Sequence, residues 1–224
     1  MREKIKIEYE QIKEMRDNID APVDTMGCHL FCDDKLDKNI SNFHIIVGAF
    51  LSSQTQDKIT YSAMQRLKKR GLSIDFILDT PLNVLANLLK PVGFYNKKAK
   101  MLKTISSIFK NDFDYKPPTK YEDLIKLPGI GPKIAVLIDN VLNKEKCGIC
   151  VDTHVHRITN RIGWVKTKKP EETRKKLENI LDKENWDEIN YILVGFGQTI
   201  CKARKPNCSE CLLNKTCNYY KLNK

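Results

Sequence analysis

The stretch Leu127-Pro128-Gly129-Ile130-Gly131-Pro132-Lys133 separates two apolar segments that have helical spacing. One segment begins at Tyr121, and the other runs from Ile134 to Leu142. Because two glycines flank a single apolar residue, the backbone between the segments can turn tightly and approach another molecule closely. Pro132 suits the first position of the second helix, where an N–H would have no intrahelical partner. The stretch therefore predicts two helices joined by a short turn.

Lys133 would stand in the first turn of the second helix, beside backbone N–H groups that have no partner inside the helix. Such N–H groups bind phosphate well. One interpretation is a helix-hairpin-helix in which Gly129 and Gly131 contact a nucleic-acid backbone and Lys133 takes part in chemistry. The other is an ordinary turn between helices with a solvated lysine. The stretch alone does not decide between them, because short motifs also occur by chance.

The chain has 224 residues, of which 41% are hydrophobic, and its 39 Lys and Arg against 28 Asp and Glu give a net charge of +11. This length allows a substantial core in one or two domains. The positive charge favours a polyanionic partner, either nucleic acid or an anionic membrane surface. No apolar run approaches the ~20 residues of a membrane-spanning helix, so we expect no membrane segment.

Apolar periodicity is helical along most of the chain, and no segment indicates a strand. We therefore expect an all-α protein of about ten or more short helices. Caps and breakers predict helices over residues 2–19, 40–51, 58–70, 81–90, 97–110, 134–142, 154–163 and 186–201, and a further helix that starts at Pro170. Asn96 is the expected cap of the helix over 97–110, and Gly163 is the expected end of the helix over 154–163.

Four of the eight cysteines follow the spacing C-x6-C-x2-C-x5-C, namely Cys201, Cys208, Cys211 and Cys217. The charged N-terminus shows no signal or transit peptide, so we expect a reducing compartment, in which cysteines act as metal ligands or thiols. Four thiolates can hold either zinc or a 4Fe-4S cluster. Zinc sites usually pair two short knuckles and this stretch has one, which favours the iron–sulfur cluster. For the remaining cysteines, Cys28, Cys32, Cys147 and Cys150, we expect a packing role.

Two basic runs lie beside these motifs, Lys97, Lys98, Lys100 and Lys103 in one and Lys202, Arg204 and Lys205 in the other. A run of like charge is usually a solvated face. The second run adjoins the cysteine motif, and we expect Lys202 to contact DNA phosphates.

Three motifs occur in order along the chain: the hairpin stretch, then Val151-Asp152-Thr153-His154, then the cysteine cluster. This combination resembles the endonuclease III family of DNA glycosylases and AP lyases, of the helix-hairpin-helix, iron–sulfur type. The resemblance extends from about Asn39 to Cys217. It is closest to the eukaryotic branch through four further stretches, residues 51–57, 63–67, 152–157 and 193–198.

The resemblance implies a bilobed all-α fold, with a six-helix domain over 35–145 and an iron–sulfur cluster domain over 1–34 plus 146–224. DNA would lie across the cleft between the two. It also implies a bifunctional enzyme that excises oxidised pyrimidines and cuts the strand by β-elimination in base excision repair. The expected partner is double-stranded DNA that contains oxidised pyrimidines or abasic sites. We expect a monomer in the nucleus, with mitochondria as the alternative location.

By the same resemblance, Lys133 matches the family's lysine nucleophile and Asp152 its assisting aspartate. Gln54 matches the residue that fills the gap left by the extruded base. Phe94 matches a wedge position that is often leucine in the family. Asp152 is also an expected N-cap, and the N–H bonds that a cap accepts favour the ionised carboxylate.

Two alternatives remain, a monofunctional adenine DNA glycosylase and a non-catalytic helix-hairpin-helix protein that binds DNA. The first lacks a lysine at the position of Lys133 and usually carries an additional C-terminal domain. The second needs neither Lys133 nor Asp152. The presence of both residues favours the bifunctional enzyme.

Overall fold

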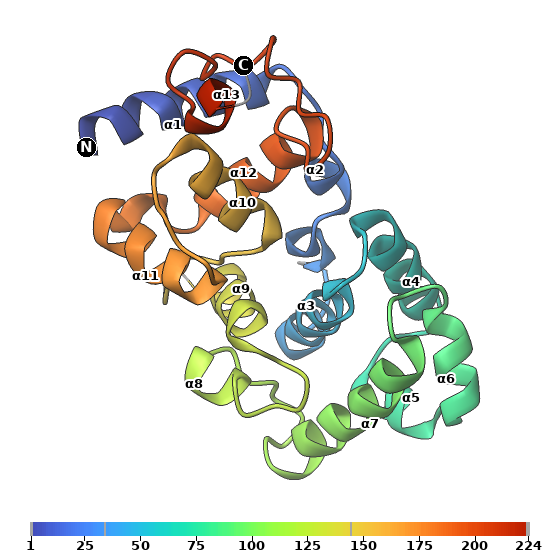
Figure 1. The fold of residues 1–224 in the computed structure, drawn as a ribbon. Coiled ribbons are helices and arrows are strands. Elements are labelled where there is room, and N and C mark those ends of the chain that lie inside the picture. Colours follow the sequence, from blue (N-terminus) through green and yellow to red (C-terminus); the bar gives the residue numbers. More distant parts are fainter. Residues whose placement is uncertain (1, 34, 144, 223–224) are drawn as a thin grey trace. The chain divides into compact units, whose positions relative to one another are not determined.

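The computed structural model of the chain describes residues 2–33, 35–143 and 145–222, and this part of the chain is all-α (Figure 1). It holds thirteen α-helices and two short 3-10 helices, with no strand among the described residues. The all-α prediction is therefore confirmed. No helix in these ranges is long and apolar enough to cross a membrane.

The chain forms two compact units, one of Met1–Asp24 with Lys146–Lys224 and the other of Thr25–Glu145. The sequence-based division was drawn at residue 35 instead. Residues just before that point belong with the second unit because the 3-10 helix η1 (Cys28–Phe31) packs on α3 (Lys38–Ser52). Phe31 is 1% exposed, and its ring fills the space where a side chain on Gly48 would lie.

The unit 25–145 is built around α3. Every residue of this helix from Ser41 to Leu51 is buried, and Asp37 caps its start by accepting the N–H of Asn39 at 2.8 Å. The surrounding helices are α4 (Asp57–Lys69), α5 (Ile74–Asp79), α6 (Leu82–Leu89), α7 (Tyr95–Asn111), α8 (Tyr121–Leu124) and α9 (Pro132–Leu142), with α2 (Pro22–Met26) at the border of the unit. Because α3 is buried on all its faces from Ser41 to Leu51, it lies at the centre of this unit's core.

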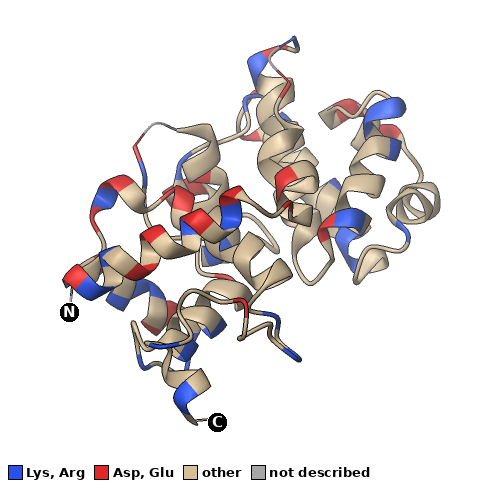
Figure 2. Cartoon of the chain, turned by 90° about the horizontal axis from the view of Figure 1, so that it is seen from above, with Lys and Arg blue, Asp and Glu red and all other residues tan. Residues whose placement is uncertain are grey.

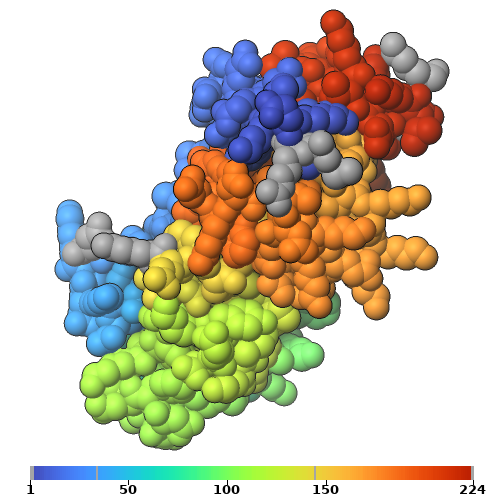
Figure 3. Space-filling view, turned by 90° about the vertical axis from the view of Figure 1, so that its left-hand side faces the viewer, coloured from blue at the N-terminus to red at the C-terminus, as the bar shows by residue number. Residues whose placement is uncertain are grey.

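The other unit joins the two ends of the chain. Its helices are α1 (Arg2–Asp17), α10 (Thr153–Ile162), α11 (Pro170–Ile180), α12 (Glu188–Thr199) and α13 (Asn218–Leu222), with a short 3-10 helix η2 (Lys183–Asn185). In Figure 3 the C-terminal segment lies against the N-terminal helix. Tyr9 donates to Glu188 at 2.9 Å, and the Trp164 indole donates to Glu8 at 2.8 Å. The helix α1 is therefore bonded to α12 and to the segment that follows α10.

Several predicted helix boundaries differ from the structure by one or two residues. The helix α7 begins at Tyr95 with Phe94 as its N-cap residue, so the predicted cap at Asn96 was wrong. The helix α6 begins at Leu82, one residue after Pro81. The helix predicted over 40–51 runs from Lys38 to Ser52 as α3, and the one predicted over 186–201 runs from Glu188 to Thr199 as α12. The predicted boundaries of α10 are confirmed, since Asp152 caps it and Gly163 ends it with a positive φ of 88°.

Candidate active site and thiol cluster

The hairpin, residues 127–133, joins α8 to α9 as its sequence predicted. Gly129 has a φ of 81°, a conformation that residues with a Cβ rarely adopt. A Cβ at Gly129 would also lie 2.8 Å from the Met101 sulfur and 2.9 Å from the Phe50 ring. Gly131 differs, since a Cβ there would meet nothing within 4 Å. The turn therefore needs glycine at 129 for two separate reasons and leaves open space at 131.

Lys133 lies exposed in the first turn of α9, directly after Pro132 at the helix start. Gly131 is the N-cap residue and has no side chain to occupy the first N–H groups of the helix. Burial raises the pKa of the Cys28 thiol to about 11, and the positive charge of Lys133 opposes this shift. The chain thus presents a basic side chain at a helix N-terminus that is suited to an anion.

Gln54 and Phe94 lie in two neighbouring segments of the same unit, residues 51–55 at the end of α3 and residues 91–94 before α7, which we call the paired loops. Both residues have left-handed backbone conformations, with φ of 52° and 56°. Both side chains are exposed, and that of Phe94 is 66% exposed. Together with Gly129 they line a cavity of about 240 Å³. The structure therefore brings three of the predicted DNA-binding residues to one place.

The basic run beside these loops divides into two kinds of lysine. Lys97 and Lys100 are exposed, as expected of a solvated face. Lys98 is only 6% exposed, and Lys103 donates to the backbone oxygens of Ile77 and Leu78 at the end of α5. The expectation of a solvated face was wrong for these two, because the run lies on a helix that turns them toward the protein.

Asp152 is the N-cap of α10 in the other unit, and its carboxylate accepts the N–H of Val155 at 2.8 Å. The carboxylate is half-buried. On the same helix, burial lowers the pKa of Arg157, whose guanidinium donates to the backbone oxygens of Gly197 and Cys201 at 3.3 and 3.0 Å. The start of α10 therefore holds a fixed carboxylate, and its next turn anchors the segment that leads into the cysteine motif.

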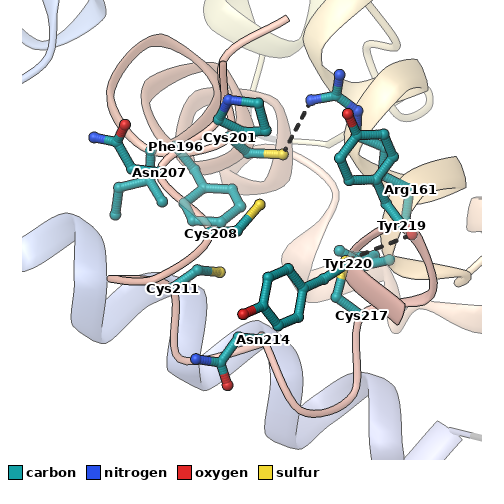
Figure 4. Close-up of a pocket in the computed structure, with 13 residues that line it drawn as sticks. Arg161, Phe196, Cys201, Asn207, Cys208, Cys211, Asn214, Cys217, Tyr219 and Tyr220 are labelled. Atoms are coloured by element: carbon teal, nitrogen blue, oxygen red, sulfur yellow. Dashed lines mark hydrogen bonds between the residues drawn. The ribbon is translucent and has the colours of Figure 1, made fainter. Parts of the chain in front are cut away.

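The thiols of Cys201, Cys208, Cys211 and Cys217 line one cavity and point toward a common space (Figure 4). Burial raises the pKa of the Cys211 thiol to about 11. Four soft thiolate donors around one space fit an iron–sulfur cluster. Over residues 2–33, 35–143 and 145–222, no group of three or more His, Cys, Asp or Glu residues suits a single metal ion.

Arg161 holds the loop that carries these cysteines, a role that the sequence analysis missed. Its guanidinium donates to the backbone oxygens of Lys202 and Ala203 at 2.7 and 2.9 Å and lies 3.7 Å from the Cys201 sulfur. The ring of Tyr219 stacks on it at 4.4 Å. Lys202 itself is exposed on this loop. Nothing in the local sequence of α10 signals such a contact, because the partners come from a distant loop.

Lys and Arg are spread over elements of both units, and α1 carries charges of both signs (Figure 2). Among the remaining cysteines, Cys150 is buried and Cys28 is half-buried, in line with packing. Cys32 and Cys147 are exposed, so the packing role expected for these two was wrong.

Comparison with known proteins gives consistent results. Residues 47–183 match the family described as HhH-GPD superfamily base excision DNA repair protein. The chain is 45% identical over 212 residues to Endonuclease III-like protein 1 of Gallus gallus, which covers 94% of this chain and 75% of that protein. It is 43% identical over 222 residues to the Endonuclease III homolog of Encephalitozoon cuniculi, covering 93% and 92% of the two chains. The solved "Structure of a non-covalent Endonuclease III-DNA Complex" shares the fold with a TM-score of 0.86 at 24% identity, covering 100% of this chain and 98% of that one.

Proposed function

Because this chain belongs to the endonuclease III family within the HhH-GPD superfamily of base excision DNA repair proteins, we propose that it removes a damaged base and then cuts the strand with Lys133 as nucleophile. The chain is a base excision repair DNA glycosylase, as its motifs predicted. The observation that carries the proposed role is the place of Lys133, an exposed residue in the first turn of α9, at the end of the hairpin.

Lys133 would attack C1′ of the damaged nucleotide, so that a C–N bond to the enzyme forms as the bond to the base breaks. Ring opening of the sugar then gives a Schiff base, which acidifies the C2′ proton. Loss of that proton expels the 3′ phosphate and cuts the strand. The amine attacks in its neutral form, so a proton must leave Lys133 before the C–N bond forms.

The test is covalent trapping. Borohydride reduces a Schiff base, so the wild-type protein should form a stable adduct with a duplex that contains thymine glycol. Lys133→Gln should abolish both the adduct and enzyme-catalysed strand cutting yet still bind the duplex, because the hairpin N–H groups remain. Full strand cutting by Lys133→Gln would overturn the assignment. Base removal without any cutting or adduct in the wild-type protein would favour a monofunctional glycosylase, and no reaction at all would favour a non-catalytic DNA-binding protein.

Asp152 would stabilise the positive charge that develops on the sugar as the base leaves. Its bond to the Val155 N–H holds the carboxylate oxygen in place. Asp152→Asn should slow base removal by about 10²-fold while leaving DNA binding intact, because a neutral amide stabilises a cation poorly. On a pre-formed abasic site the loss should be smaller, since that bond is already broken. Equal losses on both substrates in single-turnover assays would contradict this role.

Gln54 and Phe94 would act on the opened duplex. An enzyme that works on a base must take it out of the stack, at a cost of a few kcal/mol by general estimates. Exposed side chains on the paired loops can fill the gap that the base leaves, while the hairpin at Gly129 and Gly131 contacts the phosphates. Lys202 would contact a further phosphate, which adds affinity without sequence preference.

The thiols of Cys201, Cys208, Cys211 and Cys217 would hold a 4Fe-4S cluster, as donor chemistry and family membership support. When bound, the cluster would fix the loop between them, and its role would be mainly structural. A yellow-brown protein with iron and sulfide is the expected result, and stoichiometric zinc without visible absorption would contradict it. We further propose oxidised pyrimidines and abasic sites in double-stranded DNA as substrates, a monomeric state, and action in the nucleus.

A further inference from the structure

Lys98 is a buried cation whose three N–H groups are all used within the paired loops. Its Nζ donates to the backbone oxygens of Leu51 at 2.8 Å and Ser53 at 2.5 Å, and to the hydroxyl of Thr55 at 3.2 Å. A lysine ammonium has three N–H donors, so these acceptors satisfy it. Burial lowers the pKa of Lys98 to about 8, but the residue is only 6% exposed and its nitrogen is bonded to three acceptors, so it is no candidate nucleophile.

The three acceptors of Lys98 lie at one end of α3, and each is a neutral oxygen. The C-terminal end of a helix carries partial negative charge, which partly offsets the cost of burying a cation there. Lys98 itself lies in the first turn of α7, where its backbone N–H donates to the Phe94 oxygen at 2.9 Å. One residue therefore bonds to the segment on either side of Gln54 and to Phe94.

The hydroxyl of Thr55 completes this arrangement. It donates to the Ser53 oxygen at 3.2 Å and accepts from the Gly93 N–H at 3.1 Å as well as from Lys98. A hydroxyl has one donor and two acceptor positions, so all three are occupied. Because Gly93 immediately precedes Phe94, this hydroxyl joins the two loops directly.

The loops also touch through their backbones. A Cβ on Gly93 would lie 2.6 Å from the Gln54 oxygen, so any larger residue would push the loops apart. Gln54 and Phe94 each take a left-handed conformation that non-glycine residues rarely hold unless their surroundings impose it. Each is flanked by residues tied into the Lys98 and Thr55 bonds, while its own side chain stays exposed.

We propose that Lys98 and Thr55 are positioning residues that lock the paired loops into one rigid unit, so that Gln54 and Phe94 enter the DNA duplex together in a fixed register. The inference rests on the proposed role of Gln54 and Phe94 in the opened duplex. It explains why a cation is buried without a carboxylate partner among its bonded acceptors. A fixed backbone beneath exposed side chains is the arrangement that a gap-filling element needs, since misplacement of about 1 Å can cost ~10²-fold in rate.

The test compares base removal from thymine glycol in a fully paired duplex with removal from an unpaired bubble, under single-turnover conditions. An unpaired base has already lost part of its extrusion cost. Lys98→Met and Thr55→Val should each lose at least ~10-fold more activity on the paired substrate than on the bubble. Thr55→Ser keeps the hydroxyl and should keep the wild-type ratio. The double variant with Lys98→Met and Gln54→Ala should lose less activity on the paired substrate than the two single losses combined. The reason is that both substitutions act through Gln54.

Lys103 supplies the matched control. It lies on the same helix and also donates to two backbone oxygens, at 3.0 and 2.7 Å, but these belong to α5. Lys103→Met should therefore change activity on both substrates alike.

Equal losses on both substrates for Lys98→Met and Thr55→Val would overturn the proposal and leave these residues a purely structural role. If Lys98→Met fails to fold, the comparison of Thr55→Val with Thr55→Ser decides. If Gln54→Ala itself loses equally on both substrates, the gap-filling role fails and this proposal fails with it. Borohydride trapping by Lys133 would be unaffected in that case. This distinguishes a failure of the gap-filling role from a failure of the proposed lyase activity.

Discussion

The hairpin and the paired loops approach the same cavity with turns that are built in opposite ways. The conformation of the hairpin is determined by its own residues, because Gly129 permits a positive φ and Pro132 starts the next helix. The paired loops place non-glycine residues in the same region of backbone space, and Lys98, more than forty positions away from its acceptors along the chain, holds one of them there. A turn encoded locally can be recognised from sequence, whereas a turn imposed by a distant side chain cannot.

The largest expected effect is on the free energy of unfolding and comes from a substitution in the hairpin. Gly129→Ala should lower the free energy of unfolding by about 2–4 kcal/mol, because it combines a disfavoured φ with contacts to Met101 and the buried Phe50 ring that are too close. Gly131→Ala is the matched control, since open space surrounds that position and its φ is −92°. Its effect should stay within about 0.5–1 kcal/mol.

Denaturant unfolding of the two variants measures this difference. Equal stability of Gly129→Ala and Gly131→Ala would mean that the hairpin adapts to a side chain at either glycine. The local encoding of the turn would then be wrong.

The same contrast explains what the sequence could predict. Helix ends depend on nearby residues, which is why the cap at Asp152 and the stop at Gly163 were predicted correctly. The cap at Asn96 was wrong because Phe94 starts α7 from a left-handed conformation that its own chemistry disfavours. The burial of Lys98 could not be predicted, since a lysine on an amphipathic helix is ordinarily solvated.

The thiol cluster is a second example of what the sequence could and could not predict. Cysteine spacing indicated a shared site, and the four thiols do line one cavity. The hydrogen bonds from Arg161 to the cysteine loop could not be predicted, because their acceptors are backbone oxygens, which every residue has. Side chains that bind distant backbone leave no pairing signal in a single sequence.

A second prediction concerns Lys98 in the paired loops and the pH dependence of stability that it causes. Burial lowers the pKa of Lys98 from 10.5 to about 8, so above pH 8 the unfolded chain holds this proton more tightly than the folded one. Stability rises with pH wherever the unfolded state binds more protons. From about pH 7.5 to about pH 9.5, the wild type should therefore gain about 1–2 kcal/mol relative to Lys98→Met.

Denaturant unfolding of both proteins across this range isolates Lys98, because the other groups that titrate are common to both. Lys103→Met serves as control and should follow the wild-type pH dependence. A constant difference between wild type and Lys98→Met would show that the Lys98 ammonium is not destabilised by burial, which would weaken the contrast between the two turns.

The smallest expected effect tests whether the paired loops store strain. Gln54 has a φ of 52°, which glycine adopts without a steric penalty, whereas other residues pay about 1 kcal/mol or more. Gln54→Gly relieves this strain but adds backbone freedom to the unfolded chain, so its stability should change by no more than about 0.5–1 kcal/mol, in the stabilising direction relative to Gln54→Ala. Both variants lack the side chain that would fill the gap in the duplex, so both should lose activity on a paired lesion. A Gln54→Gly protein less stable than Gln54→Ala would mean that the left-handed conformation is not strained, and that Lys98 and Thr55 merely accompany the loop instead of imposing its shape.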